Sequence, residues 1–275
     1  MAYRHDKYRY GPGGKYIEHE IKYAGKYGAK GEKREPRKKA TPEQIKKQNQ
    51  WNREKKVLRM IRANFGKGDL WVTLKFPKGT RMTGEELKGV RKKFLDKLRT
   101  AYKKRGTCLK YICRLEIGEN GGPHMHIVVN RLKGQQGAAE VIQEIWEKYG
   151  KYLYFTPLYE EGDFKDLACY ITKQLKEETI AGQLTLFGQE EDRSIFSAYT
   201  RSQNLVQAEP ETHEYSRRTV RKLVEEGPEP EQGYYIDRDS IRCGENPYTG
   251  MSYYYYTEIR LEPDEQAEWK AGDDG

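Results

Sequence analysis

Polar and apolar residues alternate with a period of two in four short segments of the chain, which predicts β-strands. Alternate side chains of a strand share a face, so each segment has one apolar face and one more polar face. The second and third segments are joined by ENGG, a short glycine-containing connection typical of a β-hairpin. The four segments are LWVTLKF (70–76), LKYICRLEIG (109–118), PHMHIVVN (123–130) and KYLYFTPLY (151–159).

Other segments carry apolar residues at helical spacing. The segment 83–106 opens with Thr83 and Glu86, the Thr-x-x-Glu pattern of a capping box. Its apolar stripe consists of Leu87, Val90, Phe94, Leu98 and Ala101. Three further helices are predicted: a lead-in helix from Thr41 to near Phe65, one over 138–149, and an amphipathic one over 163–178 with Asp163 as its N-cap.

The order strand, helix, strand, strand, helix, strand predicts an α+β protein with the ferredoxin-like arrangement βαββαβ. In that arrangement the first and third strands lie at the centre of an antiparallel sheet, and both helices cover one face. The apolar strand residues then face the helices, and the polar ones form an open face. The predicted open face carries Trp71, Thr73, Lys75, Arg114, Glu116, His124 and His126.

Residues outside this pattern predict a division into three parts. Residues 1–40 combine many Lys and Arg with Tyr and Gly and lack an apolar period, which indicates a disordered basic arm. Residues 41–180 form the compact domain. Residues 181–275 are predicted to be a loop-rich appendage with a short helix near 214–226 and a terminal pair of strands.

Composition and charge narrow the class of protein. Of the 275 residues, 36% are hydrophobic and 34% are charged, which fits a compact domain with polar flanks. The net charge of +9 favours a polyanionic partner, because Lys and Arg release condensed counterions when they contact phosphates. No stretch approaches the ~20 apolar residues of a membrane span, and MAYRHDKYRY lacks the apolar core of a signal peptide. We therefore expect a cytoplasmic protein that binds nucleic acid and no membrane.

Candidate chemistry lies on the predicted open face. His124 and His126 are two residues apart on one strand, so both imidazoles project to the same side. If the hairpin closes over 118–123, Glu116 falls across from His124. Two imidazoles and a carboxylate suit a divalent metal, such as Mn²⁺, or Mg²⁺ with help from substrate phosphates. Glu119 in the same hairpin is the alternative third ligand.

Two other metal-protein classes share part of this pattern. A cupin also places His-x-His after a glycine, but it carries a Glu at the positions where Asn130 and Arg131 stand here. A facial-triad oxygenase, like a cupin, is an all-β protein, whereas this chain alternates strands with helices. Both classes are disfavoured.

A tyrosine and a lysine follow on the last predicted helix. Tyr170 and Lys173 are three residues apart, so they can face the same direction. A phenol is a poor nucleophile at its usual pKa near 10, but a metal or an ammonium nearby favours the phenolate.

Taken together, WVTLKF, PHMHIVV preceded by EIGENGG, and YITKQ resemble the HUH endonuclease superfamily in order and spacing. Within it, the likeness is to single-tyrosine rolling-circle replication initiators, the Rep proteins of phages, plasmids and integrative elements. The resemblance covers roughly 70–178. It implies that His124, His126 and Glu116 bind Mg²⁺ or Mn²⁺. It also implies that Tyr170 attacks a DNA phosphodiester and that Lys173 assists at the phosphate.

The activity implied by this resemblance is metal-dependent nicking and joining of single-stranded DNA at a specific site. The tyrosine would form a 5′-phosphotyrosine intermediate, and the freed 3′-OH would start rolling-circle replication. Some relatives carry a second tyrosine where this chain has Gln174, so the one-tyrosine type fits best. Contacts to DNA are expected from Lys75, Arg114, Trp71 and Gln174.

The resemblance also predicts the partners. These are single-stranded origin DNA in a hairpin, a host helicase because the chain lacks a Walker A motif, and a host polymerase. A relaxase or a single-tyrosine transposase of the same superfamily shares this chemistry and stays an alternative. The alternative outside enzymology is a non-catalytic ferredoxin-like nucleic-acid-binding protein, which would carry aromatic residues on the open face.

Overall fold

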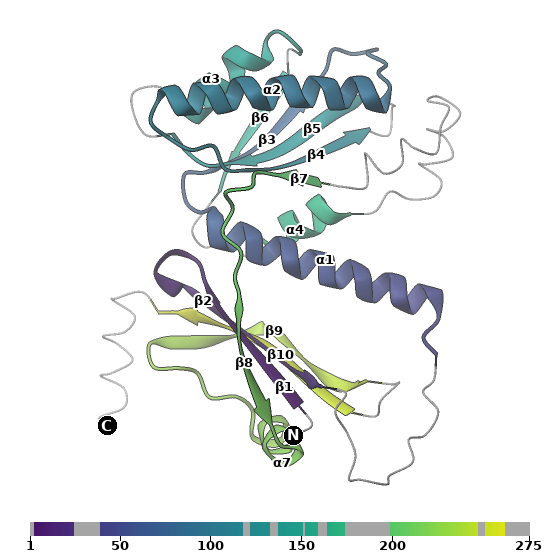
Figure 1. Cartoon of the computed structure of the whole chain (residues 1–275), viewed down its shortest axis with the longest axis vertical. Helices are drawn as coiled ribbons and strands as arrows, with labels where there is room; N and C mark the ends of the chain where they lie inside the picture. Colours follow the sequence, from purple (N-terminus) through teal and green to yellow (C-terminus); the bar gives the residue numbers. More distant parts are fainter. Residues whose placement is uncertain are drawn as a thin grey trace. The chain divides into compact units, whose positions relative to one another are not determined.

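The computed structural model shows an α+β protein with two antiparallel five-stranded sheets (Figure 1). The chain divides into two compact units, one formed by Asn49–Val206 and the other by Met1–Gln48 together with Gln207–Gly275. No helix among the described residues is long and apolar enough to cross a membrane. The structure describes residues 3–24, 39–117, 122–132, 137–150, 152–158, 164–173, 199–246 and 251–261.

The unit Asn49–Val206 contains the sheet with strand order β6-β3-β5-β4-β7. Four of its strands lie in the four segments that the period-two pattern predicts, and β3 and β5 are neighbours inside the sheet. The fifth strand, β7, lies in the predicted appendage and pairs with β4. The strands are β3 (Leu70–Lys75), β4 (Tyr111–Ile117), β5 (Pro123–Val129), β6 (Tyr152–Pro157) and β7 (Tyr199–Arg201).

Helices α2 (Gly84–Lys104) and α3 (Ala138–Trp146) cover one side of this sheet, as Figure 1 shows. The capping box predicted at the start of α2 is present, because Thr83 and Glu86 each accept a hydrogen bond from the other's backbone N–H. The core on this side is built around Trp146, whose ring meets Phe76 and Phe94 edge to face.

The opposite side of the sheet is not wholly open, and this part of the prediction is wrong. Helices α1 (Pro42–Asn64) and α4 (Lys165–Thr172) pack on it and form a second apolar cluster. The strands contribute Ile112 and Val128, two apolar residues on the face that is otherwise polar. Burial of these side chains against the helices leaves part of the face, with the two histidines, uncovered by the cluster.

Gly150, between α3 and β6, provides a stability prediction. A Cβ atom at this position would overlap the Lys75 carbonyl and lie 2.7 Å from Trp146 Nε1. Gly150→Ala should therefore destabilise the protein by about 1–3 kcal/mol, the usual cost of overpacking. Gly89→Ala in α2 is the matched control, because nothing lies within 4 Å of its Cβ position and removal of a helix glycine should stabilise by roughly 0.5–1 kcal/mol. Urea unfolding of both variants checks the opposite signs, and equal midpoints would contradict the packing argument.

The second sheet has the strand order β8-β1-β2-β10-β9 and combines the two ends of the chain. Helix α7 (Arg217–Glu226) follows β8, within the segment predicted to be a short helix, and its Val220 packs in the cluster with Tyr3, Ile21 and Tyr254. A 3₁₀ turn (Pro12–Gly14) joins the first two strands. The strands are β1 (Tyr3–Tyr10), β2 (Tyr16–Tyr23), β8 (Pro210–Tyr215), β9 (Tyr234–Asn246) and β10 (Met251–Arg260).

This sheet corrects two predictions about the domains. Residues 3–23 are not a disordered arm but two strands, and 207–275 does not form a separate appendage because its strands pair with β1 and β2. Tyrosine is a good strand former, and the apolar partners of the N-terminal strands come from β10, more than two hundred residues away. Since β2 lies at the centre of the sheet, deletion of residues 1–40 would remove two of five strands rather than a tail.

A buried histidine in this unit makes its stability dependent on pH. His5 Nε2 lies 2.9 Å from His19 Nδ1, and His19 Nε2 lies 3.0 Å from the buried Glu258 carboxylate. Burial, followed by the charges of His19 and His213, lowers the pKa of His5 from 6.5 to about 4. The unfolded chain therefore binds the proton more readily, and this contribution to stability is present above pH 6.5 and lost as the pH falls toward 4.

We expect the unfolding midpoint of wild type to fall more steeply between pH 6.5 and 4 than that of His5→Gln, which cannot take up this proton. Circular dichroism melts across this range measure the difference. Carboxylates titrate in both proteins and cancel in the comparison. Parallel pH curves would show that His5 does not carry the effect.

Candidate active site

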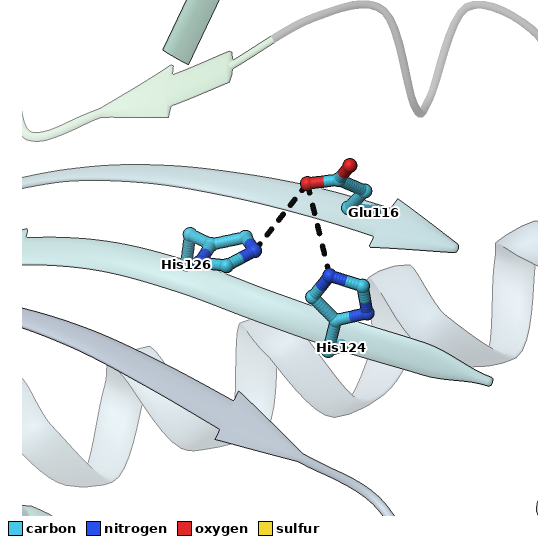
Figure 2. Close-up of side chains that lie close together, drawn as sticks. All are labelled: Glu116, His124 and His126. Atoms are coloured by element: carbon cyan, nitrogen blue, oxygen red, sulfur yellow. Dashed lines mark ion pairs between the residues drawn. The ribbon is translucent and has the colours of Figure 1, made fainter. Parts of the chain in front are cut away.

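The candidate site is built on the hairpin of β4 and β5. Glu116 lies directly across from His124, and Arg114 lies across from His126, so the predicted cross-strand position of Glu116 is confirmed. Figure 2 shows the three side chains of the cluster converging from two adjacent strands. Glu116 Oε2 lies 3.7 Å from His124 Nε2 and 3.3 Å from His126 Nε2. Glu119, the alternative third ligand, lies outside the described residues.

Glu116, His124 and His126 form a possible metal-binding triad, whose ligand atoms all lie within 4.8 Å of one another. Two imidazole nitrogens and one carboxylate oxygen are compatible with a divalent cation. His126 Nδ1 lies 3.1 Å from Thr73 Oγ1 on β3, a contact that aims Nε2 toward the carboxylate. Alternation along the strand places Thr73 on this face, but no sequence pattern signals this orienting contact.

Tyr170 reaches the triad from helix α4. Its hydroxyl donates a hydrogen bond of 2.6 Å to Glu116 Oε2 and lies 2.7 Å from His126 Nε2. Its ring makes edge contacts with His126 and with Trp71, at centroid distances of 4.8 and 5.7 Å. Packing of α4 through Ala168 and Ile171 holds this tyrosine over the sheet.

The three groups adjust one another's protonation. Burial raises the pKa of Tyr170, and the nearby Glu116 carboxylate raises it further. Burial also favours the neutral form of Glu116, but hydrogen bonds from His124, His126 and Tyr170 outweigh it and hold the pKa of Glu116 well below its usual value. Burial, followed by the charge of His124, lowers the pKa of His126 although Glu116 opposes this. The site therefore pairs a carboxylate and a neutral imidazole, both in ligand form, with a neutral phenol.

Arg114 has a different place from the one predicted. Its side chain is only 2% exposed, and Nη1 donates hydrogen bonds of 2.8 Å to the backbone carbonyls of Tyr170 and Ile171. These carbonyls belong to the last turn of α4, where a cation is favoured. Arg114 thus ties the end of α4 to β4 and positions Tyr170, and the prediction of a surface contact to DNA is wrong.

Lys173 does not share a helix face with Tyr170, contrary to the prediction. Helix α4 ends at Thr172, and Lys173 follows as an exposed C-cap residue with non-helical backbone angles. Within the part of the chain that the structure describes, its side chain makes no hydrogen bond or ion pair. The hydrogen bonds from Arg114 close the helix before this residue, and the predicted Asp163 and Gln174 lie outside the described residues.

The two remaining predicted DNA contacts differ in exposure. Lys75 is exposed on β3, directly across from His124, and its ammonium lies 4.9 Å from the centre of the Tyr154 ring. Trp71 is half-buried, with its ring stacked on His126 at 5.2 Å. Lys75 is therefore accessible to a phosphate, whereas Trp71 supports His126 and Tyr170 from behind.

Comparison with known proteins agrees with this region of the chain. Residues 69–177 match the model of a family described as replication-associated protein ORF2. The matched region is less than half of the chain but contains the triad and Tyr170. The match supports a rolling-circle replication initiator family. No curated protein and no solved structure matches this chain.

Proposed function

We propose that this chain is a replication initiator of the HUH type, which nicks and rejoins single-stranded origin DNA through Tyr170. One observation carries the proposal: the Tyr170 hydroxyl lies 2.6 Å from Glu116 Oε2 and 2.7 Å from His126 Nε2, within a region similar to replication-associated proteins. A nucleophile candidate placed against a metal-ligand triad is the arrangement that phosphoryl transfer requires.

Glu116, His124 and His126 would hold Mg²⁺ or Mn²⁺. When bound, the cation would neutralise charge on the phosphate oxygens and stabilise the transition state. Thr73 and Trp71 would keep His126 in its ligand orientation through the contacts described above.

The reaction is a transesterification in which the Tyr170 oxygen forms a bond to phosphorus as the bond from phosphorus to the 3′ oxygen breaks. The phenol loses its proton and the leaving oxygen gains one, so the products are a 5′-phosphotyrosine and a free 3′-OH. The raised pKa of Tyr170 keeps the phenol neutral before DNA binds, so proton removal is part of the attack. Reversal rejoins the strand, and the 3′-OH would serve a host polymerase, with a host helicase opening the duplex.

The sheet order supports the same assignment. Strands β6-β3-β5-β4, with α2 and α3 on one face, have the arrangement of a ferredoxin-like βαββαβ unit. A non-catalytic nucleic-acid binder of this fold would display aromatic rings on the central strands. Here the aromatic residue of the central strand β3, Trp71, is stacked on a ligand histidine instead.

The test uses single-stranded oligonucleotides that tile the replicon encoding the chain, incubated with the protein and Mn²⁺. We expect one oligonucleotide to yield a protein–DNA adduct that survives denaturing electrophoresis, with the nucleotide on Tyr170 in peptide mapping. Chelation of the metal should prevent the adduct. Cleavage without any adduct would replace the proposal with a plain metal-dependent nuclease.

A further inference from the structure

Strand β6 at the edge of the sheet displays two exposed tyrosines. The side chains of Tyr152 and Tyr154 are 52% and 56% exposed, whereas Leu153 and Phe155, which alternate with them, pack against the core under α2 and α3. Both tyrosines therefore point to the side of the sheet away from that core.

This side is the one that carries the triad. Tyr152 lies across from Lys75, and Lys75 lies across from His124. Tyr154 lies across from Thr73, whose hydroxyl contacts the second ligand histidine. Residues directly opposite one another on antiparallel strands share a face, so the two rows continue from the triad across β3 to the edge of the sheet. Two strand spacings, roughly 10 Å, separate β6 from β5.

The chemistry of these rows suits a nucleic acid strand. Exposed aromatic rings stack on bases of any sequence, and a neighbouring cation contacts the phosphates between them. Lys75 supplies this cation, with its ammonium 4.9 Å from the Tyr154 ring centre. The net charge of +9 adds attraction for a polyanion. Exposed aromatic side chains on an edge strand favour unwanted pairing, so strand propensity alone does not account for two of them without a charge between them.

We infer that Tyr152 and Tyr154 form a base-stacking subsite for the single-stranded DNA that flanks the cleaved phosphate, with Lys75 contacting its backbone. This inference rests on the proposed function, because it assumes that the scissile phosphate lies at the triad. A strand held there and extended along the two rows places its neighbouring bases over β6.

The test compares binding of two fluorescent strands of equal length, oligothymidylate and a backbone of abasic units, to the full-length protein in EDTA. Stacking requires bases, so wild type should prefer oligothymidylate. The double variant Tyr152→Ala/Tyr154→Ala should bind oligothymidylate at least about tenfold more weakly and the abasic strand equally well. Tyr152→Phe/Tyr154→Phe should retain the preference, because the rings remain. Lys75→Ala should weaken binding of both strands and reduce the salt slope by about one.

The matched control is Tyr235→Ala, which removes a tyrosine of similar exposure (44%) from β9. An equal loss in this control would show that the effect is not local to β6 and would overturn the subsite. If wild type binds oligothymidylate and the double alanine variant binds it as tightly, the subsite is wrong while the proposed function stands. If wild type binds neither strand, the proposed function itself fails. A change in molar mass by light scattering, without loss of DNA affinity, would assign the tyrosines to contacts between protein copies instead.

Discussion

Replacement of Tyr170 by Phe should abolish both the covalent adduct and strand cleavage while DNA binding persists. The change removes the only atom of this side chain that can attack phosphorus. Loss of a nucleophile from a catalytic unit lowers the rate by about 10⁴- to 10⁶-fold, so turnover should fall below detection. The ring contacts with Trp71 and His126 remain, and the lost hydrogen bond to Glu116 should change stability by only about 1 kcal/mol.

Tyr102→Phe is the matched control for this experiment. It also removes a buried tyrosine hydroxyl, which donates to the Asn130 carbonyl, but it lies on α2 away from the triad. This variant should cleave at the wild-type rate. Denaturing gels and peptide mapping compare the two variants. Cleavage by Tyr170→Phe at a comparable rate, or an adduct on another tyrosine, would contradict the assignment.

Replacement of His124 or His126 by Ala should abolish metal-dependent cleavage. Each change removes one of three ligands, and the charge stabilisation that a metal supplies is worth several kcal/mol, or about 10²- to 10⁴-fold in rate. His126→Ala should be the more damaging, because His126 also contacts Tyr170, Trp71 and Thr73. Titration calorimetry with Mn²⁺ in the absence of DNA should show weakened binding for both variants.

His213→Ala provides the control, because this histidine is exposed on β8 in the other unit. It should leave both Mn²⁺ binding and cleavage unchanged. Full cleavage by the His124→Ala/His126→Ala double variant would remove the metal site from the proposal. Glu116→Gln and Glu119→Ala separate the two candidates for the third ligand, and a defect confined to Glu119→Ala would transfer the role to that residue.

The features that depend on neighbouring residues were predictable from the amino-acid sequence. The four strands of the first sheet follow from alternation, and the N-terminus of α2 follows from Thr83 and Glu86. The common face of His124 and His126 follows from their spacing, and the position of Glu116 opposite them follows from a short hairpin that leaves little freedom of register. Each of these features is local along the chain, so its pattern is visible without the fold.

The features that depend on distant pairing required the three-dimensional fold. The sequence of β1 and β2 indicates a polar arm, because their apolar partners lie on β10, far along the chain. The sequence around Arg114 indicates a surface cation, but the carbonyl end of α4 buries it, and the same contacts end that helix before Lys173. The contact of Tyr170 with Glu116 and His126 depends on α4 packing over the sheet through Ala168 and Ile171. Long-range packing selects among several arrangements that have the same local periodicity, and for that reason no pattern within a short segment determines it.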